Sequence, residues 1–108
     1  DGGTCVWCGR RPWPADRSLE HLCPRSRGGA GEAANLQLAC RRCNRHRRSR
    51  SASAYARERT GAGLRPGFAR LEAAFGELLG SPRRAHREYA ATELRHLPAA
   101  RAATVGLD

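Results

Sequence analysis

The second half of the chain carries a clear helical pattern. Between residues 64 and 79, apolar side chains recur at alternating intervals of four and three, which predicts one amphipathic helix. The apolar stripe consists of Leu64, Phe68, Leu71, Phe75, Leu78 and Leu79. Gly80 follows the stripe and is typical of a helix end. This helix is expected to pack its stripe on the rest of the molecule.

A second helix is predicted directly afterwards. Ser81 followed by Pro82 is typical of a helix start, with the hydroxyl as N-cap and proline in the first turn. The helix is expected to end near Leu97, because Pro98 follows, and the last ten residues are expected to fray. Its apolar face is thin: Ala85, Tyr89, Leu94 and Leu97. Together the two helices predict a helical hairpin.

In the first half of the chain the predicted elements are shorter. Residues 18–23 and 35–38 predict two short strands, and the loop between them is rich in glycine. From Cys40 the Arg- and Ala-rich run predicts one helix to about Arg59. The expected fold class is therefore α+β: a small module at residues 1–59, then a helical extension at 60–108 packed on it. The turn-rich stretch at 60–63 marks the boundary.

Composition complicates this picture, because large apolar residues are scarce. Leu, Val and Phe total 15 of 108 residues, Ile and Met are absent, and the net charge is +10. Such a balance is typical of chains that bury too little apolar surface to fold unaided. A fold of this length therefore needs a second source of stability.

The cysteines can supply that stability. Cys5 and Cys8 form one Cys-x-x-Cys pair, and Cys40 and Cys43 form another. Two such pairs predict a four-thiolate zinc site, although the 31 residues between them exceed the usual roughly 15–20 and indicate an inserted segment. The alternative is a pair of redox dithiols, but no thioredoxin-like βαβ pattern surrounds them. The odd Cys23 is expected to be a small buried residue.

Cysteine usage also bears on location. An odd number of cysteines, no signal peptide and no transmembrane run favour a reducing, cytoplasmic setting without membrane attachment.

The inserted segment resembles the HNH endonucleases, the zinc-containing branch of the ββα-metal (His-Me finger) nucleases. The resemblance covers about residues 4–50 and rests on motifs in a fixed order. After the first Cys pair come the acid-histidine pair Glu20-His21, Pro-x-Ser-x-Gly-Gly at 24–29, Asn35 before an apolar strand, and Cys-x-x-Cys-Asn ending at Asn44. The ordered set is specific, whereas each motif alone is weak.

The resemblance implies a role for each of these side chains. His21 would be the general base that activates water, because imidazole titrates near neutral pH. Glu20, where the family usually has Asp, and Asn44 would hold a catalytic Mg²⁺ or Mn²⁺ ion. Asn35 would hold the loop and orient the base. His46 is a rival to Asn44, two residues later. The zinc would be structural, and no small-molecule cofactor is expected.

Arginine is concentrated beside these motifs. All 20 basic residues are Arg, and six of the ten positions at 41–50 are Arg. A basic stripe next to a phosphate-cleaving site is what a nucleic-acid backbone requires. The predicted contacts are Arg25, Arg27, Arg41, Arg42, Arg45, Arg47 and Arg48. DNA is the expected partner, with RNA left open, as are sequence preference and oligomeric state.

Two other functions compete with an endonuclease. The same basic face could serve a non-catalytic zinc module that binds nucleic acid, although such a module has no need of Glu20, His21 and Asn44 together. Alternatively, the zinc half could be a scaffold and the helical hairpin a protein-interaction element. His86 and His96 lie outside the motifs and are expected at the surface.

Overall fold

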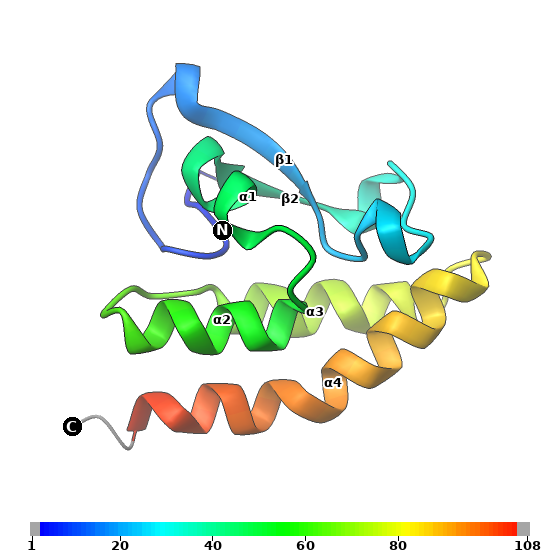
Figure 1. Ribbon diagram of the computed structural model, residues 1–108. Helices are drawn as coiled ribbons and strands as arrows, with labels where there is room; N and C mark the ends of the chain where they lie inside the picture. Colours follow the sequence, from blue (N-terminus) through cyan, green and yellow to red (C-terminus); the bar gives the residue numbers. More distant parts are fainter. Residues whose placement is uncertain (1–2, 106–108) are drawn as a thin grey trace.

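The computed structural model describes residues 3–105 and has two parts (Figure 1). One part is a two-stranded antiparallel hairpin with a short helix against it. The other is a layer of three longer helices that lies beneath the first part in Figure 1. The described chain is therefore a mixed α+β fold, as the sequence predicted.

The hairpin pairs β1 (Arg17–His21) with β2 (Leu36–Cys40), close to the two predicted strands. The register sets Arg17 opposite Cys40 and His21 opposite Leu36. The hairpin thus has a cysteine end and a histidine end. The long connection at the histidine end carries two short 3₁₀ turns, Arg25–Arg27 and Ala33–Asn35.

The predicted helix from Cys40 to Arg59 is interrupted, so that expectation was wrong. Helix α1 (Arg41–Arg47) ends at Arg48, whose φ of 55° lies outside the helical region. Helix α2 (Ala52–Gly61) starts anew, with the Ser51 hydroxyl accepting a hydrogen bond from the Ala54 amide at 3.3 Å. The break lets α2 leave the hairpin and pack on α4.

The amphipathic stripe is confirmed in part as α3 (Phe68–Leu78), whose buried face includes Phe68, Leu71, Phe75 and Leu78. Leu64 lies before the helix, and Leu79, at its end, is exposed. The second helix, α4 (Arg84–Val105), does not end before Pro98 as predicted. Leu97 and Ala100 are both buried on the two sides of the proline, and this packing sustains the helix where one backbone hydrogen bond is lost. Figure 1 shows α4 bending along its length, as proline-containing helices do.

The core joins the two parts. Trp7, from the segment before β1, meets Tyr55 of α2 edge to face, with ring centroids 5.2 Å apart. Phe75 of α3 lies 5.9 Å from Tyr89 of α4. Few large side chains are available, so alanines such as Ala52, Ala56 and Ala90 complete the buried surface. One aromatic contact thus joins the hairpin part to the helices, and the other joins α3 to α4.

Candidate active site and metal centre

Four cysteines meet at one end of the hairpin. The first pair lies on a turn at residues 5–9, in which the Gly9 amide donates to the Cys5 carbonyl at 2.9 Å. The second pair lies where β2 passes into α1, with Cys40 as N-cap of the helix. The sulfur atoms of Cys5, Cys8, Cys40 and Cys43 lie within 4.8 Å of one another. The predicted four-cysteine cluster is confirmed.

This cluster has the chemistry of a metal site. A zinc ion with bonds of about 2.3 Å to four sulfurs requires sulfur separations of about 3.8 Å, so a small contraction would suffice. A hydrogen bond from the Cys43 thiol lowers the pKa of Cys5 to about 4. The backbone amides of Trp7 and Cys43 also donate to cysteine sulfurs, each at 3.4 Å. The four residues can therefore hold a thiophilic ion such as zinc.

Glu20 lies on the buried face of β1, which does not suit the predicted role. One carboxylate oxygen accepts a hydrogen bond from the Trp7 indole at 2.8 Å, and the other lies 3.5 Å from the Arg47 guanidinium. Burial raises the pKa of Glu20 above its ordinary value, although Arg47 and Trp7 act in the opposite direction. Both carboxylate oxygens thus face protein donors in the core, which favours a structural role over metal binding. In this arrangement Glu20 is a structural residue.

The prediction that Arg47 contacts nucleic acid was wrong, because a side chain that binds nucleic acid must reach the surface. Only 1% of Arg47 is exposed. Its guanidinium donates to the carbonyls of His21 at 2.9 Å and Leu22 at 2.8 Å, and to the Tyr89 hydroxyl at 2.9 Å. It also lies over the Trp7 ring, 4.9 Å from the centroid. Arg47 therefore fixes the backbone at the histidine end of β1.

His21 is the last residue of β1 and lies beneath the glycine-rich loop. Its Nε2 atom is buried and has no hydrogen-bond partner within residues 3–105. A side chain added at Gly31 would lie 3.8 Å from this nitrogen, so the loop passes directly beside it. Burial, and then the charges of Arg25 and His86, lower the pKa of His21. The lowered pKa favours the neutral imidazole, and Nε2 has no hydrogen-bond partner among the described residues.

Asn35 is fully buried and connects both sides of the same loop. Its amide oxygen accepts from the Cys23 amide at 2.8 Å, and its Nδ2 atom donates to the carbonyls of Cys23 at 3.0 Å and Ala30 at 2.9 Å. These bonds hold the loop that covers His21. Any part that Asn35 plays in orienting the base stays a prediction.

His86 is a site residue that the sequence did not reveal. The surface position expected for it was wrong, because the side chain is fully buried. Its Nε2 accepts a hydrogen bond from the Ala30 amide at 3.0 Å, and its Nδ1 lies 3.3 Å from the Ser81 hydroxyl. Helix α4 thereby contacts the loop held by Asn35. No motif marks His86, and only the packing of α4 identifies it.

Asn44 lies on α1 facing β1. Its Nδ2 donates to the Ser18 hydroxyl at 3.0 Å and to the Leu19 carbonyl at 3.3 Å. Within the described residues no hydrogen bond joins Asn44 to Glu20 or His21. The structure brings Asn44 to the middle of β1, but it does not assemble the predicted metal ligands.

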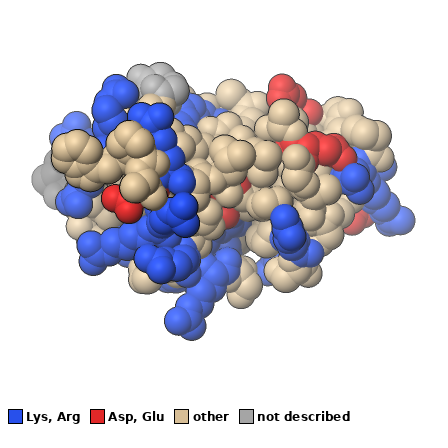
Figure 2. Space-filling view, turned by 90° about the horizontal axis from the view of Figure 1, so that it is seen from above, with Lys and Arg blue, Asp and Glu red and all other residues tan. Residues whose placement is uncertain are grey.

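The remaining predicted arginines are exposed. They are Arg25, Arg27, Arg41, Arg42, Arg45 and Arg48. Arg41 donates to the Ala15 carbonyl at 2.9 Å. Figure 2 shows the Arg side chains gathered at the left end of the face that carries the hairpin, with most of the visible acidic groups toward the other end. This end of the molecule is suited to a polyanion.

The geometry defines a small α+β module in which a cysteine cluster lies at one end of a hairpin and a sheltered histidine at the other. A family model described as HNH endonuclease matches residues 5–58, half of the chain. The chain therefore belongs to the HNH endonuclease family. Searches of curated proteins and of solved structures gave no match.

The family match ends before α3. Helix α4, with His86 and Tyr89, therefore lies outside the matched residues. None of the helices within residues 3–105 combines the length and apolar character needed to span a bilayer.

Proposed function

We propose that this protein is an endonuclease that hydrolyses DNA phosphodiester bonds, with His21 as the general base. The main support for this proposal is the environment of His21. Its Nε2 has no partner among the described residues and its pKa is lowered, and both suit the imidazole to accept a proton. Membership of the HNH endonuclease family supports the same reaction class.

Nε2 of His21 is buried beside the glycine-rich loop, so this loop has to move to admit water and substrate. In the proposed reaction, Nε2 then takes a proton from water. The water oxygen then forms a bond to phosphorus, and the bond from phosphorus to the 3′ oxygen breaks in line with the attack. The 3′ oxygen leaves and is protonated from solvent, which yields a 5′-phosphate and a 3′-hydroxyl. Arg47 supports this step indirectly, because it holds the His21 carbonyl, while Asn35 holds the loop above the ring.

The predicted ligands fit a structural zinc, but they do not fit a catalytic Mg²⁺ or Mn²⁺ ion. A structural zinc would be held by Cys5, Cys8, Cys40 and Cys43, whose spacing fits it. The predicted Mg²⁺ or Mn²⁺ ligands do not fit as a set, because Glu20 is bound to Trp7 and Arg47. Only Asn44 retains an amide oxygen with no hydrogen-bond donor among the described residues. The proposed step therefore relies on His21 and the residues that position it, and no catalytic ion is assigned.

The exposed arginines support DNA as substrate, since guanidinium groups bind phosphate oxygens in pairs. Such contacts do not distinguish DNA from RNA, because both present the same phosphates. An assay of the proposed activity must therefore include both DNA and RNA.

A second function is favoured by one specific observation. The engagement of Glu20 with Trp7 and Arg47 removes one predicted ion ligand. A non-catalytic module that binds nucleic acid through its basic face would tolerate that loss. The two functions differ in whether the sugar-phosphate backbone is cut.

The test is an assay of the zinc-loaded protein on supercoiled plasmid and on structured RNA, each with EDTA, Mg²⁺ or Mn²⁺. The proposal expects nicked or linear DNA, with ends that ligase can seal. Dependence on added Mg²⁺ or Mn²⁺ would show that a divalent ion takes part despite the position of Glu20. Binding of DNA without cleavage under all these conditions would favour the non-catalytic module.

A further inference from the structure

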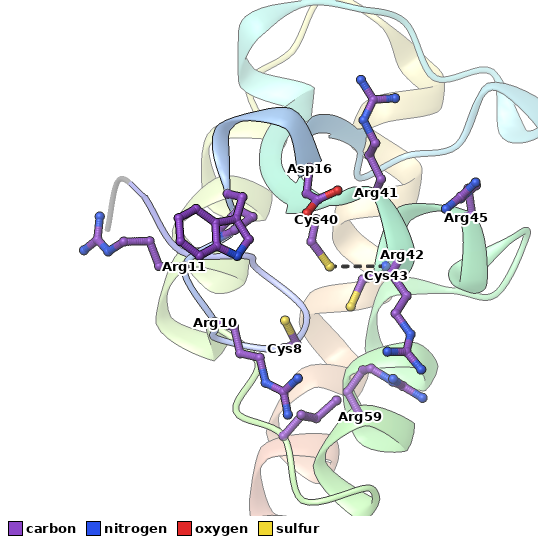
Figure 3. Close-up of a pocket in the computed structure, with 13 residues that line it drawn as sticks. Cys8, Arg10, Arg11, Asp16, Cys40, Arg41, Arg42, Cys43, Arg45 and Arg59 are labelled. Carbon is purple, nitrogen blue, oxygen red and sulfur yellow. Dashed lines mark hydrogen bonds between the residues drawn. The ribbon is translucent and has the colours of Figure 1, made fainter.

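A cavity of about 600 Å³ lies beside the cysteine cluster, at the end of the hairpin opposite His21. We call it the arginine basin, after the residues that line it: Arg10, Arg11, Arg41, Arg42, Arg45 and Arg59. Figure 3 shows these side chains around Cys8, Cys40 and Cys43. Arg10, Arg11 and Arg59 were not among the predicted contacts, because they are distant in sequence from the run at 41–50.

The positive charge of the arginine basin is not neutralised by its surroundings. Asp16 is the only acidic residue that lines it within residues 3–105. Among those residues, Arg10, Arg11, Arg42 and Arg45 form no ion pair, while Arg59 pairs with Glu58 at 3.3 Å. A zinc ion with four thiolates carries two negative charges. Six guanidiniums still exceed the charges of this zinc site, Asp16 and Glu58 by two, so the basin favours an additional anion.

Two of these arginines are held close together. Arg42 and Arg59 also line a smaller hollow with Cys43 and His46. The Arg59 guanidinium lies 5.2 Å from the centroid of the Tyr55 ring, and its buried Nε has no hydrogen-bond partner within residues 3–105. Like charges and an unpaired buried donor are both unfavourable. A phosphate oxygen between the two guanidiniums would relieve the repulsion between these like charges.

The arginine basin also carries an aromatic side chain. Trp13 lines the cavity and is 79% exposed, in contrast to the fully buried Trp7. Pro12 and Pro14 on either side restrict the backbone that presents it. Arginines along a groove together with an exposed aromatic ring are typical of surfaces that bind unpaired nucleotides, because a base stacks on the ring while phosphates meet the arginines. Bases within a duplex do not offer their faces in this way.

The hairpin register sets the distance from the basin to His21. Cys40, which lines the basin, pairs with Arg17, four residues from His21 along β1. Four residues of strand span about 13 Å. A strand of a duplex advances about 3.4 Å per nucleotide along the axis and an unpaired strand advances further, so at most about four nucleotides cover that distance. A strand at His21 could therefore reach the basin within a few nucleotides.

From these observations we infer that the arginine basin binds a single-stranded segment of nucleic acid, with one unstacked base on Trp13. The inference rests on the proposed function, because it names the form of the substrate: DNA with a frayed or single-stranded portion beside the cleavage position.

The test measures binding of fluorescently labelled 12-nucleotide single strands, blunt duplexes and tailed duplexes. Wild type is compared with Trp13→Ala and with the double variant Arg10→Ala/Arg42→Ala. The matched control is Arg84→Ala/Arg95→Ala, which removes the same charge from exposed positions on α4. Zinc content and circular dichroism confirm that each variant is folded. A second assay follows cleavage of plasmid by the same proteins.

Single strands and tailed duplexes are expected to bind more tightly than blunt duplexes. Trp13→Ala should weaken that binding by about 5- to 150-fold, the range for loss of one base stack. Arg10→Ala/Arg42→Ala should weaken it and reduce its salt dependence, whereas the α4 control should change it little. The fluorescence of Trp13 should be quenched by the single strand.

Three results would overturn the inference. They are equal affinity for blunt and tailed duplexes, an unchanged affinity of Trp13→Ala, and equally tight binding of poly-glutamate, which would identify an acidic protein as the partner. If plasmid cleavage persists in any of these cases, the inference fails while the proposed nuclease stands. If single strands bind through the basin but no DNA is cut, the nuclease fails and the basin stands.

Discussion

The guanidinium of Arg47 connects residues that are far apart in the sequence. It meets the Glu20 carboxylate, the carbonyls of His21 and Leu22 at the end of β1, and the Tyr89 hydroxyl on α4. All these groups are buried or nearly so, and buried charges need partners on every side. The backbone at His21 therefore depends on one side chain outside the catalytic groups.

Replacement of Arg47 should be costly because Glu20 would be left buried and unpaired. We expect Arg47→Met to lower the free energy of unfolding by about 3–5 kcal/mol, measured by urea denaturation. The exposed Arg48→Met should change it by about 0.5 kcal/mol or less. Adding Glu20→Gln to Arg47→Met should recover part of the loss. Equal stability of the Arg47 and Arg48 variants would contradict this account.

The charge of Arg25 affects the protonation of His21. Burial and Arg25 lower the pKa of His21, so the neutral base persists at a lower pH than usual. Activity that requires neutral His21 should therefore rise with pH through a midpoint below about 6.5. Arg25→Ala removes a positive charge and should move this midpoint to higher pH. Arg27→Ala, on the same 3₁₀ turn, is the control and should leave it in place.

The role of a single residue could be predicted from the sequence where the spacing of a motif fixes its chemistry. The cysteine cluster follows from two short repeats, because each pair is local and one metal needs both. The burial of Glu20 and Arg47 was not predictable, since charged side chains are ordinarily exposed. Their burial depends on Trp7 and Tyr89, whose approach only the fold determines.

Among the elements, α4 contributes most beyond the family match. It supplies His86, which accepts a hydrogen bond from the Ala30 amide, and Ala30 in turn accepts one from Asn35. The loop over His21 is thus held from both sides. This arrangement makes the C-terminal helix part of the candidate active site rather than an appendage.

Loss of His86 should loosen the loop more than the rest of the molecule. In His86→Ala the partly buried Ala30 amide loses its partner, at a cost of up to about 1 kcal/mol. Hydrogen exchange at Ala30 and its neighbours should accelerate, and cleavage should slow. His96→Ala, at an exposed position on the same helix, should leave both unchanged. If Ala30 exchanges at the wild-type rate in His86→Ala, the loop does not depend on α4.

The positions of the elements were predictable from periodicity, but two of their limits were not. Pro98 predicted an end to the last helix, yet buried Leu97 and Ala100 on its two sides carry α4 onward. The Arg-rich run after Cys40 contains no residue that breaks a helix, yet the chain turns at Arg48. In both cases tertiary packing overrides the local preference.

In the molecule as a whole, a small aromatic core joins three helices to the hairpin that carries the cysteine cluster. Trp7 lies two residues from Cys5 and packs on Tyr55 of α2, so the cluster and the helical layer share one core. With 15 Leu, Val and Phe residues in the sequence, neither part has a large core of its own. We therefore expect the two parts to unfold together.

Removal of the metal should unfold the molecule in one step. A structural zinc contributes on the order of 10 kcal/mol, comparable to the whole stability of a domain of this size. A strong chelator, or Cys40→Ser, should abolish the helical circular dichroism and expose Trp7 to water. Cys23→Ser, a buried cysteine outside the cluster, should keep one bound zinc and the fold. Retention of the fold after complete metal removal would refute the structural role.

If His21 is the general base of a nuclease, single-turnover cleavage should depend on its imidazole. Zinc-loaded wild type, His21→Ala and the surface control His96→Ala are compared on the same plasmid at neutral pH. General-base catalysis is worth about 10²–10⁴-fold. We predict a loss of that size in His21→Ala, with unchanged zinc content and DNA affinity, and wild-type rates in His96→Ala. Equal cleavage by wild type and His21→Ala would contradict the account.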